Sequence, residues 1–142
     1  MIEITELTID DYPEVLVLWE TTPGIGLSGA DERSAIARYL QRNPGMSFIA
    51  REEATVVGAV LCGHDGRRGF IHHLAVAPLH RRGGLGRLLV ERALEAISPH
   101  VQKCHLFVYA DNLEAREFWR ATAWVDRPEL RVMSKELGPD RR

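Results

Sequence analysis

Cysteine, long apolar runs and net charge are all scarce in this sequence, and each scarcity excludes a class of protein. The 142 residues include only two cysteines, Cys62 and Cys104, and neither belongs to a CxxC or Cys/His cluster with metal-ligand spacing. We expect both to pack as small apolar side chains, and we expect no metal site. The longest apolar stretch, Val56 to Cys62, is far too short to span a bilayer, and the first residues lack the basic-then-apolar order of a signal peptide. The expectation is a cytoplasmic protein without membrane association.

Charge of one sign is also lacking. The chain has 18 lysines and arginines against 20 aspartates and glutamates, which gives a formal net charge of −2. Such a balance provides no global field for holding nucleic acid, so an anionic ligand must bind through local geometry. No internal repeat or low-complexity tract divides the chain. Its length fits one domain over residues 1–142, with Gly138 to Arg142 as a frayed tail.

The first half of the chain predicts a strand, two helices and a β-hairpin. Apolar alternation at the N-terminus favours the strand. The helices are expected from about Asp11 to Glu20 and from about Asp31 to Asn43, with a Pro- and Gly-rich loop, Thr21 to Ala30, between them. The two hairpin strands, Ser47 to Arg51 and Val56 to Cys62, flank a short polar turn.

The second half predicts the order strand, Gly-rich turn, helix, strand and helix. Phe70 to Val76 and Lys103 to Tyr109 are expected as strands, with an amphipathic helix from about Gly84 to Ser98 between them. A strand, helix, strand crossover of this length makes the two strands parallel. Asn112 is expected to cap a helix through about Ala121, and Trp124 to Lys135 to form one or two closing strands. These elements predict an α/β fold.

The Gly-rich turn from Ala77 to Gly86 is the strongest functional signal. Its glycines let the backbone turn tightly, and they let a ligand approach the free N–H groups of the first helical turn without meeting a Cβ. Those donors and the helix dipole form an anion site, to which Arg81, Arg82 and Arg87 add charge. Taken alone, the turn is equally compatible with a Gly-rich helix start and incidental surface arginines.

The spacing of the turn adds a resemblance. The run Arg81, x, x, Gly84, x, Gly86, after a strand that ends Leu74, Ala75, Val76, resembles the coenzyme A signature of the GNAT N-acetyltransferase superfamily. It differs from the dinucleotide fingerprint GxGxxG.

A second match stands further along the chain. Asn112, Ala115 and Phe118 occupy the positions where the family has Asn, x, x, Ala, x, x, aromatic at the start of a helix. The resemblance covers most of the chain, follows the family's element order, and looks like small bacterial acetyltransferases of this superfamily. It implies fold and cofactor, and leaves the acceptor open.

The resemblance implies the acyl-CoA N-acyltransferase fold, a mixed sheet of about six or seven strands with helices on both faces and a splayed pair of parallel strands in its middle. It implies acetyl-CoA as cosubstrate, with the pantetheine arm in the gap between those strands, and transfer of acetyl to a primary amine by direct attack in a ternary complex. A backbone N–H near Leu74 and Val76 would polarise the thioester carbonyl. The implied cofactor-binding residues are Leu74, Ala75, Val76, Arg81, Arg82, Gly83, Gly84, Leu85, Gly86, Arg87, Asn112, Phe118 and Trp119.

Acetyl transfer to an ammonium acceptor needs a base, because only the free amine has a lone pair. A regular strand would point His72 and His73 to opposite faces, so that at most one faces the cleft. The resemblance implies His72, and two satisfied strand histidines are the alternative. Where many family members have a Tyr that protonates the departing thiolate, this chain has Trp119, which lacks usable acidity. Tyr109 and water are the substitutes.

The loop Thr21 to Ala30 takes the position that lines the acceptor site in the family. Around it stand Trp19, Glu20, Ser28, Asp31 and Glu32. The acidic residues either attract a cationic amine or serve as helix caps and dipole partners. The acceptor therefore stays open between a small molecule and a protein amine. A non-catalytic acyl-CoA sensor and a module for another phosphate ligand are the rival functions, and the apolar residues of Trp124 to Met133 allow a homodimer.

Overall fold

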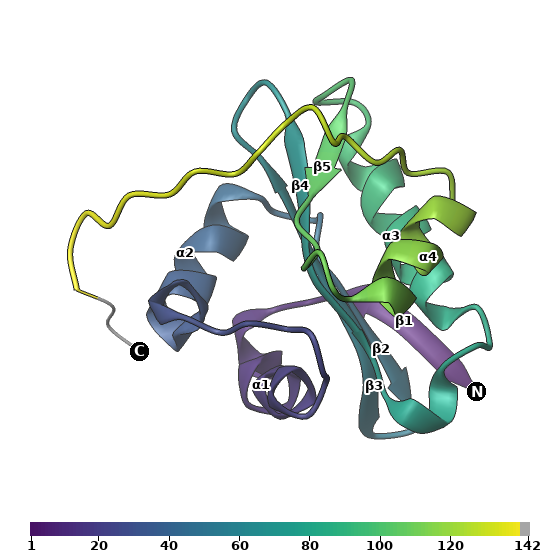
Figure 1. The fold of residues 1–142 in the computed structure, drawn as a ribbon. Helices are drawn as coiled ribbons and strands as arrows, with labels where there is room; N and C mark the ends of the chain where they lie inside the picture. The colour runs from purple at the N-terminus through teal and green to yellow at the C-terminus, as the bar shows by residue number, and fades with distance from the viewer. Residues whose placement is uncertain (140–142) are drawn as a thin grey trace.

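A mixed five-stranded sheet forms the centre of the computed structural model, which describes residues 1–139 (Figure 1). Residues 140–142, part of the expected frayed tail, lie outside the described residues. The strands stand in the order of the sequence, and every neighbouring pair is antiparallel except β4 and β5, which are parallel. They are β1 (Ile2–Glu6), β2 (Phe48–Glu52), β3 (Thr55–His64), β4 (Gly69–Val76) and β5 (Cys104–Leu106).

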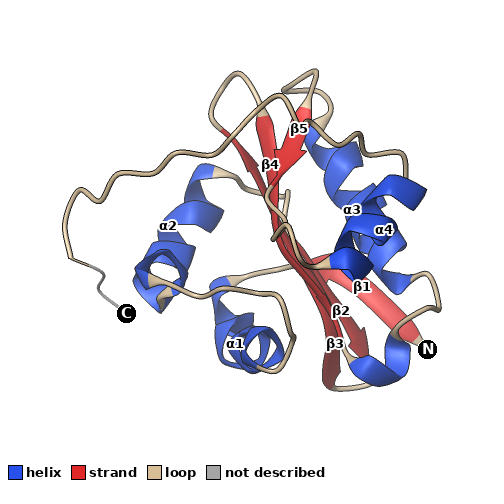
Figure 2. Ribbon diagram, in the orientation of Figure 1, coloured by secondary structure: helices blue, strands red, loops and turns tan. Residues whose placement is uncertain are grey.

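Helices cover both faces of the sheet, as the sequence predicts. α1 (Tyr12–Glu20) and α2 (Arg33–Arg42) lie on one face, and α3 (Leu85–Ile97) and α4 (Leu113–Ala121) lie on the other (Figure 2). Every predicted helix is confirmed to within a few residues. Within the described part of the chain, no helix combines the length and the apolar character needed to cross a membrane.

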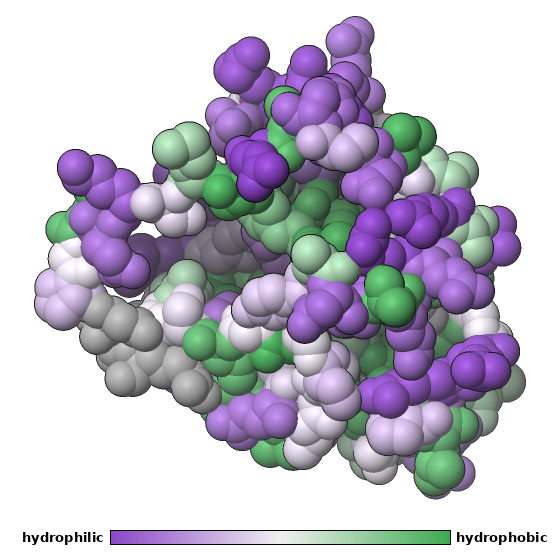
Figure 3. Space-filling view, viewed as in Figure 1, coloured by the Kyte–Doolittle hydropathy of each residue, from purple (hydrophilic) through white to green (hydrophobic). Residues whose placement is uncertain are grey.

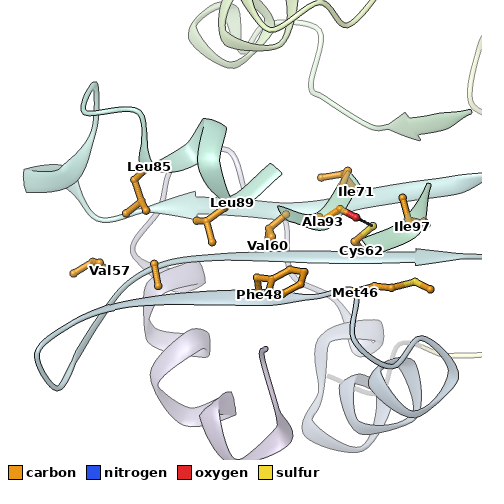
Figure 4. Close-up of a cluster of buried hydrophobic side chains, with 11 residues drawn as sticks. Met46, Phe48, Val57, Val60, Cys62, Ile71, Leu85, Leu89, Ala93 and Ile97 are labelled. Atoms are coloured by element: carbon orange, nitrogen blue, oxygen red, sulfur yellow. Dashed lines mark hydrogen bonds between the residues drawn. The ribbon is translucent and has the colours of Figure 1, made fainter. Parts of the chain in front are cut away.

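The core lies between α3 and the sheet. α3 presents one side chain per turn to β3 and β4, because residues four apart share a helix face (Figure 4). A second cluster lies between α1 and the opposite face. β3 is therefore buried on both sides, which explains its almost continuous apolar sequence. Cys62 is buried in this core and Cys104 is half-buried, both as free thiols, which confirms the expected packing role.

The prediction of closing strands over Trp124 to Lys135 is wrong for this structure. Residues 124–139 form an irregular segment, so the described sheet has five strands rather than six or seven, and the parallel pair lies at its edge rather than in its middle. Trp124 is anchored against Trp119, with ring centroids 5.2 Å apart. Beyond it the apolar side chains are exposed, Met133 at 93%. Strand-like alternation does not form a strand without a paired neighbour.

Gly69, at the start of β4, lies tightly against the α3 core. An added Cβ would lie 2.6 Å from Ile97 Cδ1 and 2.9 Å from Cys104 Sγ. We expect Gly69→Ala to lower the free energy of unfolding by about 1–3 kcal/mol, because over-packing displaces neighbours in a filled core. Urea denaturation measures this. Gly138→Ala, where a Cβ meets no atom within 4 Å, is the control; equal midpoints for the two variants would contradict the prediction.

Candidate active site

β4 and β5 run side by side over only three residue pairs. Gly69, Phe70 and Ile71 pair with Cys104, His105 and Leu106, after which β5 ends and β4 continues to Val76 (Figure 1). In the described part of the chain, the β5 side of β4 therefore has no strand partner from His72 to Val76. The divergence that the resemblance implies is present. It leaves backbone N–H and C=O groups available to an extended ligand.

A β-bulge interrupts β4 at the same place. Ala59 pairs with Ala75 and Leu61 pairs with His72, so β4 has one more residue than β3 between these pairs. His73 lies in this interval with φ of 50°. A left-handed conformation is uncommon for a residue other than glycine, and bulges with such residues often lie next to active sites.

The bulge brings both histidines to the α1–α2 face of the sheet. The His73 ring lies 5.1 Å from that of Trp19 in α1, and the His72 ring lies 6.1 Å from that of Tyr39 in α2. The two imidazoles are 6.5 Å apart. The prediction that they point to opposite faces is wrong, because the extra residue breaks the strand alternation on which it relies.

His73 is held by a buried carboxylate. Its Nε2 lies 2.8 Å from Asp31 Oδ1, and the second oxygen of Asp31 accepts the Ser28 N–H at 3.0 Å. Burial acts to raise the pKa of Asp31, but the hydrogen bond and charge of His73, together with the Ser28 N–H and the charge of His72, outweigh it and leave that pKa below its usual value. The ionised carboxylate can only accept, so His73 Nε2 donates. Sequence reasoning missed the pairing of His73 with Asp31, because the Ser28, x, x, Asp31 spacing, a capping-box signature, indicates only the bond between Ser28 and Asp31.

His72 has no such carboxylate partner among the described contacts. Its ring stacks on Phe70 at 6.2 Å and 8°. Burial lowers the pKa of His72, the charge of His73 lowers it further, and Asp31 opposes both. His72 is therefore a neutral imidazole at neutral pH, and a neutral imidazole can accept a proton.

The loop Thr21 to Ala30, which takes the family's acceptor-lining position, packs against the segment that follows β5. A Cβ on Gly26 would lie 2.5 Å from Tyr109 Oη, and one on Gly24, whose φ is 89°, would lie 2.5 Å from Asn112 Nδ2. These two glycines allow the loop to lie next to Tyr109 and Asn112. Tyr109 is 59% exposed beside the loop. Asn112 caps α4, because its Oδ1 accepts the Ala115 N–H at 3.1 Å.

The glycine turn is open at the start of α3. Gly84 has φ of 86° and no atom within 4 Å of an added Cβ, and the first-turn N–H groups of α3 have no helical partner. Arg82 and Arg87 are exposed beside it. Arg81 is engaged, since its Nε donates to the Val76 carbonyl at 2.9 Å. Phe118 of α4 lies against Gly86, with 3.5 Å from a ring carbon to an added Cβ.

The structure also locates two tryptophans that the sequence placed near the site. Trp19 of α1 is 1% exposed and packs between that helix and the sheet, so it does not line an acceptor site. Trp119 packs against Phe118 at 4.9 Å and against Trp124, next to the α3 core. Within residues 1–139 the structure groups no three His, Cys, Asp or Glu side chains in a way that could hold a metal ion.

Comparisons with known proteins place this geometry in a family. The acetyltransferase (GNAT) family model matches residues 3–123. A protein named acetyltransferase from Photorhabdus laumondii is 33% identical over 137 residues, which cover 95% of each chain. The crystal structure of the PaiA N-acetyltransferase from Thermoplasma acidophilum, in complex with coenzyme A, is similar with a TM-score of 0.74 at 16% identity, over 86% of this chain and 88% of that one. The chain belongs to the GNAT acetyltransferase family.

Proposed function

We propose that this chain transfers the acetyl group of acetyl-CoA to a primary amine, by direct attack in a ternary complex. The proposal rests on one observation, the divergence of β4 from β5 beside the glycine turn. The free edge of β4 can hydrogen-bond the amides of a pantetheine arm as a neighbouring strand would. The turn at the end of the same strand suits the diphosphate of that ligand.

The residues around the turn fit this ligand. The space next to Gly84 is open, so a diphosphate can reach the N–H groups of Leu85 and Gly86. Arg82 and Arg87 would add positive charge from the exposed surface. Arg81 contributes to the diphosphate only if it leaves the Val76 carbonyl.

The chain's own residues supply the proton transfers. The cosubstrate brings an activated acetyl group as a thioester, whose C–S bond breaks as the new C–N bond forms. His72 accepts the proton that the attacking amine loses. A β4 backbone N–H near Leu74 or Val76 donates to the carbonyl oxygen as it gains negative charge. Tyr109, or water, donates a proton to the departing sulfur, and the pair of His73 and Asp31 fixes the bulge that presents His72.

Two measurements test the proposal. We expect acetyl-CoA and coenzyme A to bind with affinities within about tenfold of each other in isothermal titration, and ATP to bind at least about tenfold more weakly because it lacks the pantetheine arm. We expect thiol release from acetyl-CoA to accelerate when a suitable primary amine from a panel is added.

The outcomes separate the alternatives. Binding of acetyl-CoA without thiol release for any amine would favour a non-catalytic acyl-CoA sensor, which Trp119 in place of the family's Tyr also favours. Equal affinity for ATP and acetyl-CoA would favour a different phosphate ligand. Either result would overturn the acetyl-transfer proposal.

A further inference from the structure

Four flat rings form a continuous row on the α1–α2 face at the β4–β5 end of the sheet. Phe70 and His72 stand two residues apart on β4, and His105 and Phe107 stand two apart in and just after β5. Because Phe70 pairs with His105 across the strands, alternation puts all four side chains on one face. The Phe70 ring lies 5.7 Å from His105 and 6.1 Å from Phe107, and Phe107 lies 6.4 Å from His72. We call these four residues the aromatic row.

The aromatic row is accessible at its β5 end. Phe107 is 62% exposed, although a phenylalanine in a folded protein is usually buried. α1 packs on β3 and β4, and α2 borders the row near His72, through Tyr39. The space-filling view shows a hollow on this side, between α2 and the β4–β5 end of the sheet, with hydrophobic residues inside it (Figure 3).

Asp31, the carboxylate that contacts His73, is already engaged. Asp31 accepts hydrogen bonds from His73 and from the Ser28 backbone, so it has no need of a ligand's ammonium group to offset its buried charge. The row itself offers four ring faces to a flat aromatic partner, whereas only its two phenylalanines are rings of the kind that attract a cation. Recognition here therefore depends on stacking rather than on ion pairing.

We propose that the amine acceptor is an arylalkylamine, whose ring stacks on Phe107 and Phe70 while its nitrogen lies beside His72. This inference rests on the proposed function for its location and adds the acceptor's chemical class. The spacing of the rings suits an amine with a two-carbon tether. In such an arylalkylamine the ring centre and the nitrogen are roughly 5 Å apart by standard bond lengths. The Phe107 and His72 rings are separated by 6.4 Å.

The test compares three amines by isothermal titration into protein saturated with coenzyme A. Phenethylamine has the ring and the tether, cyclohexylethylamine has the same apolar bulk without a flat π-face, and putrescine has charge without a ring. We expect phenethylamine to bind about 3- to 10-fold more tightly than cyclohexylethylamine, and more tightly still than putrescine. Phe107→Leu keeps an apolar side chain but should abolish the preference for phenethylamine over cyclohexylethylamine. Val17→Ala, at an exposed apolar residue of α1, is the control and should leave it unchanged.

The titration measures amine binding without turnover, so either proposal can fail while the other holds. If phenethylamine shows no preference, or if Phe107→Leu retains that preference, the arylalkylamine inference is wrong even when the protein acetylates another amine. If phenethylamine binds in a Phe107-dependent way and no thiol is released, the arylalkylamine site stands as a binding site and acetyl transfer fails.

Discussion

Replacing His72 by alanine should lower kcat/KM for acetyl transfer by roughly 10²–10⁴, the usual contribution of a general base, while acetyl-CoA affinity changes by less than about threefold. The expectation follows from where the ring lies. His72 stands at the point where β4 leaves β5, and its neighbours are rings rather than a carboxylate. By contrast, Nε2 of His73 already donates a hydrogen bond to Asp31. Steady-state thiol release and isothermal titration give the two quantities.

The pH dependence provides a second readout of the same residue. Because burial lowers the pKa of His72, its neutral form persists below the ordinary histidine value of about 6.5. A base is active when deprotonated, so its contribution should be complete at neutral pH and fall only as the pH drops below that value. The acceptor amine titrates equally in wild type and variant, so the ratio of their kcat/KM values isolates the enzyme's base. That ratio should be constant near neutral pH and shrink in acid.

The matched control for His72 is His100, which lies between α3 and β5 and has no part in the proposed mechanism. His100 is exposed and stacks on His64, with centroids 5.1 Å apart, and His100→Ala should leave both kcat/KM and its pH profile unchanged. If His72→Ala is active and His73→Ala is inactive, the general base is His73 rather than His72. Activity in both variants would mean that neither histidine removes the proton.

Local patterns were sufficient to predict most of the fold. The helix limits followed from caps and breakers such as Asn112, whose side chain caps α4 as expected. The parallel pairing of β4 and β5 followed from the crossover length. The position of the glycine turn could also be predicted from the sequence, because Gly84 has a positive φ that a side chain disfavours.

The rest depended on contacts between distant residues. The bulge at His73 is one extra residue of β4 opposite β3, and it depends on how the two strands pair. The sequence of β4 alone does not show it, so regular alternation wrongly predicted that the two histidines point to opposite faces. The pairing of His73 with Asp31 joins residues 42 apart, and no local spacing encodes it. The segment after Trp124 alternates like a strand, yet a strand also needs a neighbour to pair with.

Gly84→Asp should weaken acetyl-CoA binding by roughly 10²-fold or more, and Gly84→Asn by only about tenfold. The two side chains have nearly the same shape, and both tolerate the left-handed conformation better than other residues do. Each would project into the open space where we place the diphosphate. The difference between the variants therefore measures the repulsion between a carboxylate and the ligand's negative charge.

Stability measurements keep this result separate from a loss of folding. Gly84 is the N-cap of α3, where a negative charge interacts well with the helix dipole. Both variants should therefore melt within a few degrees of each other when no ligand is present. Because salt screens exposed charges, the affinity gap between Asp and Asn should narrow as ionic strength rises. Equal affinities at low salt would show that the diphosphate binds away from this turn, and the acetyl-CoA geometry proposed for β4 would then be wrong.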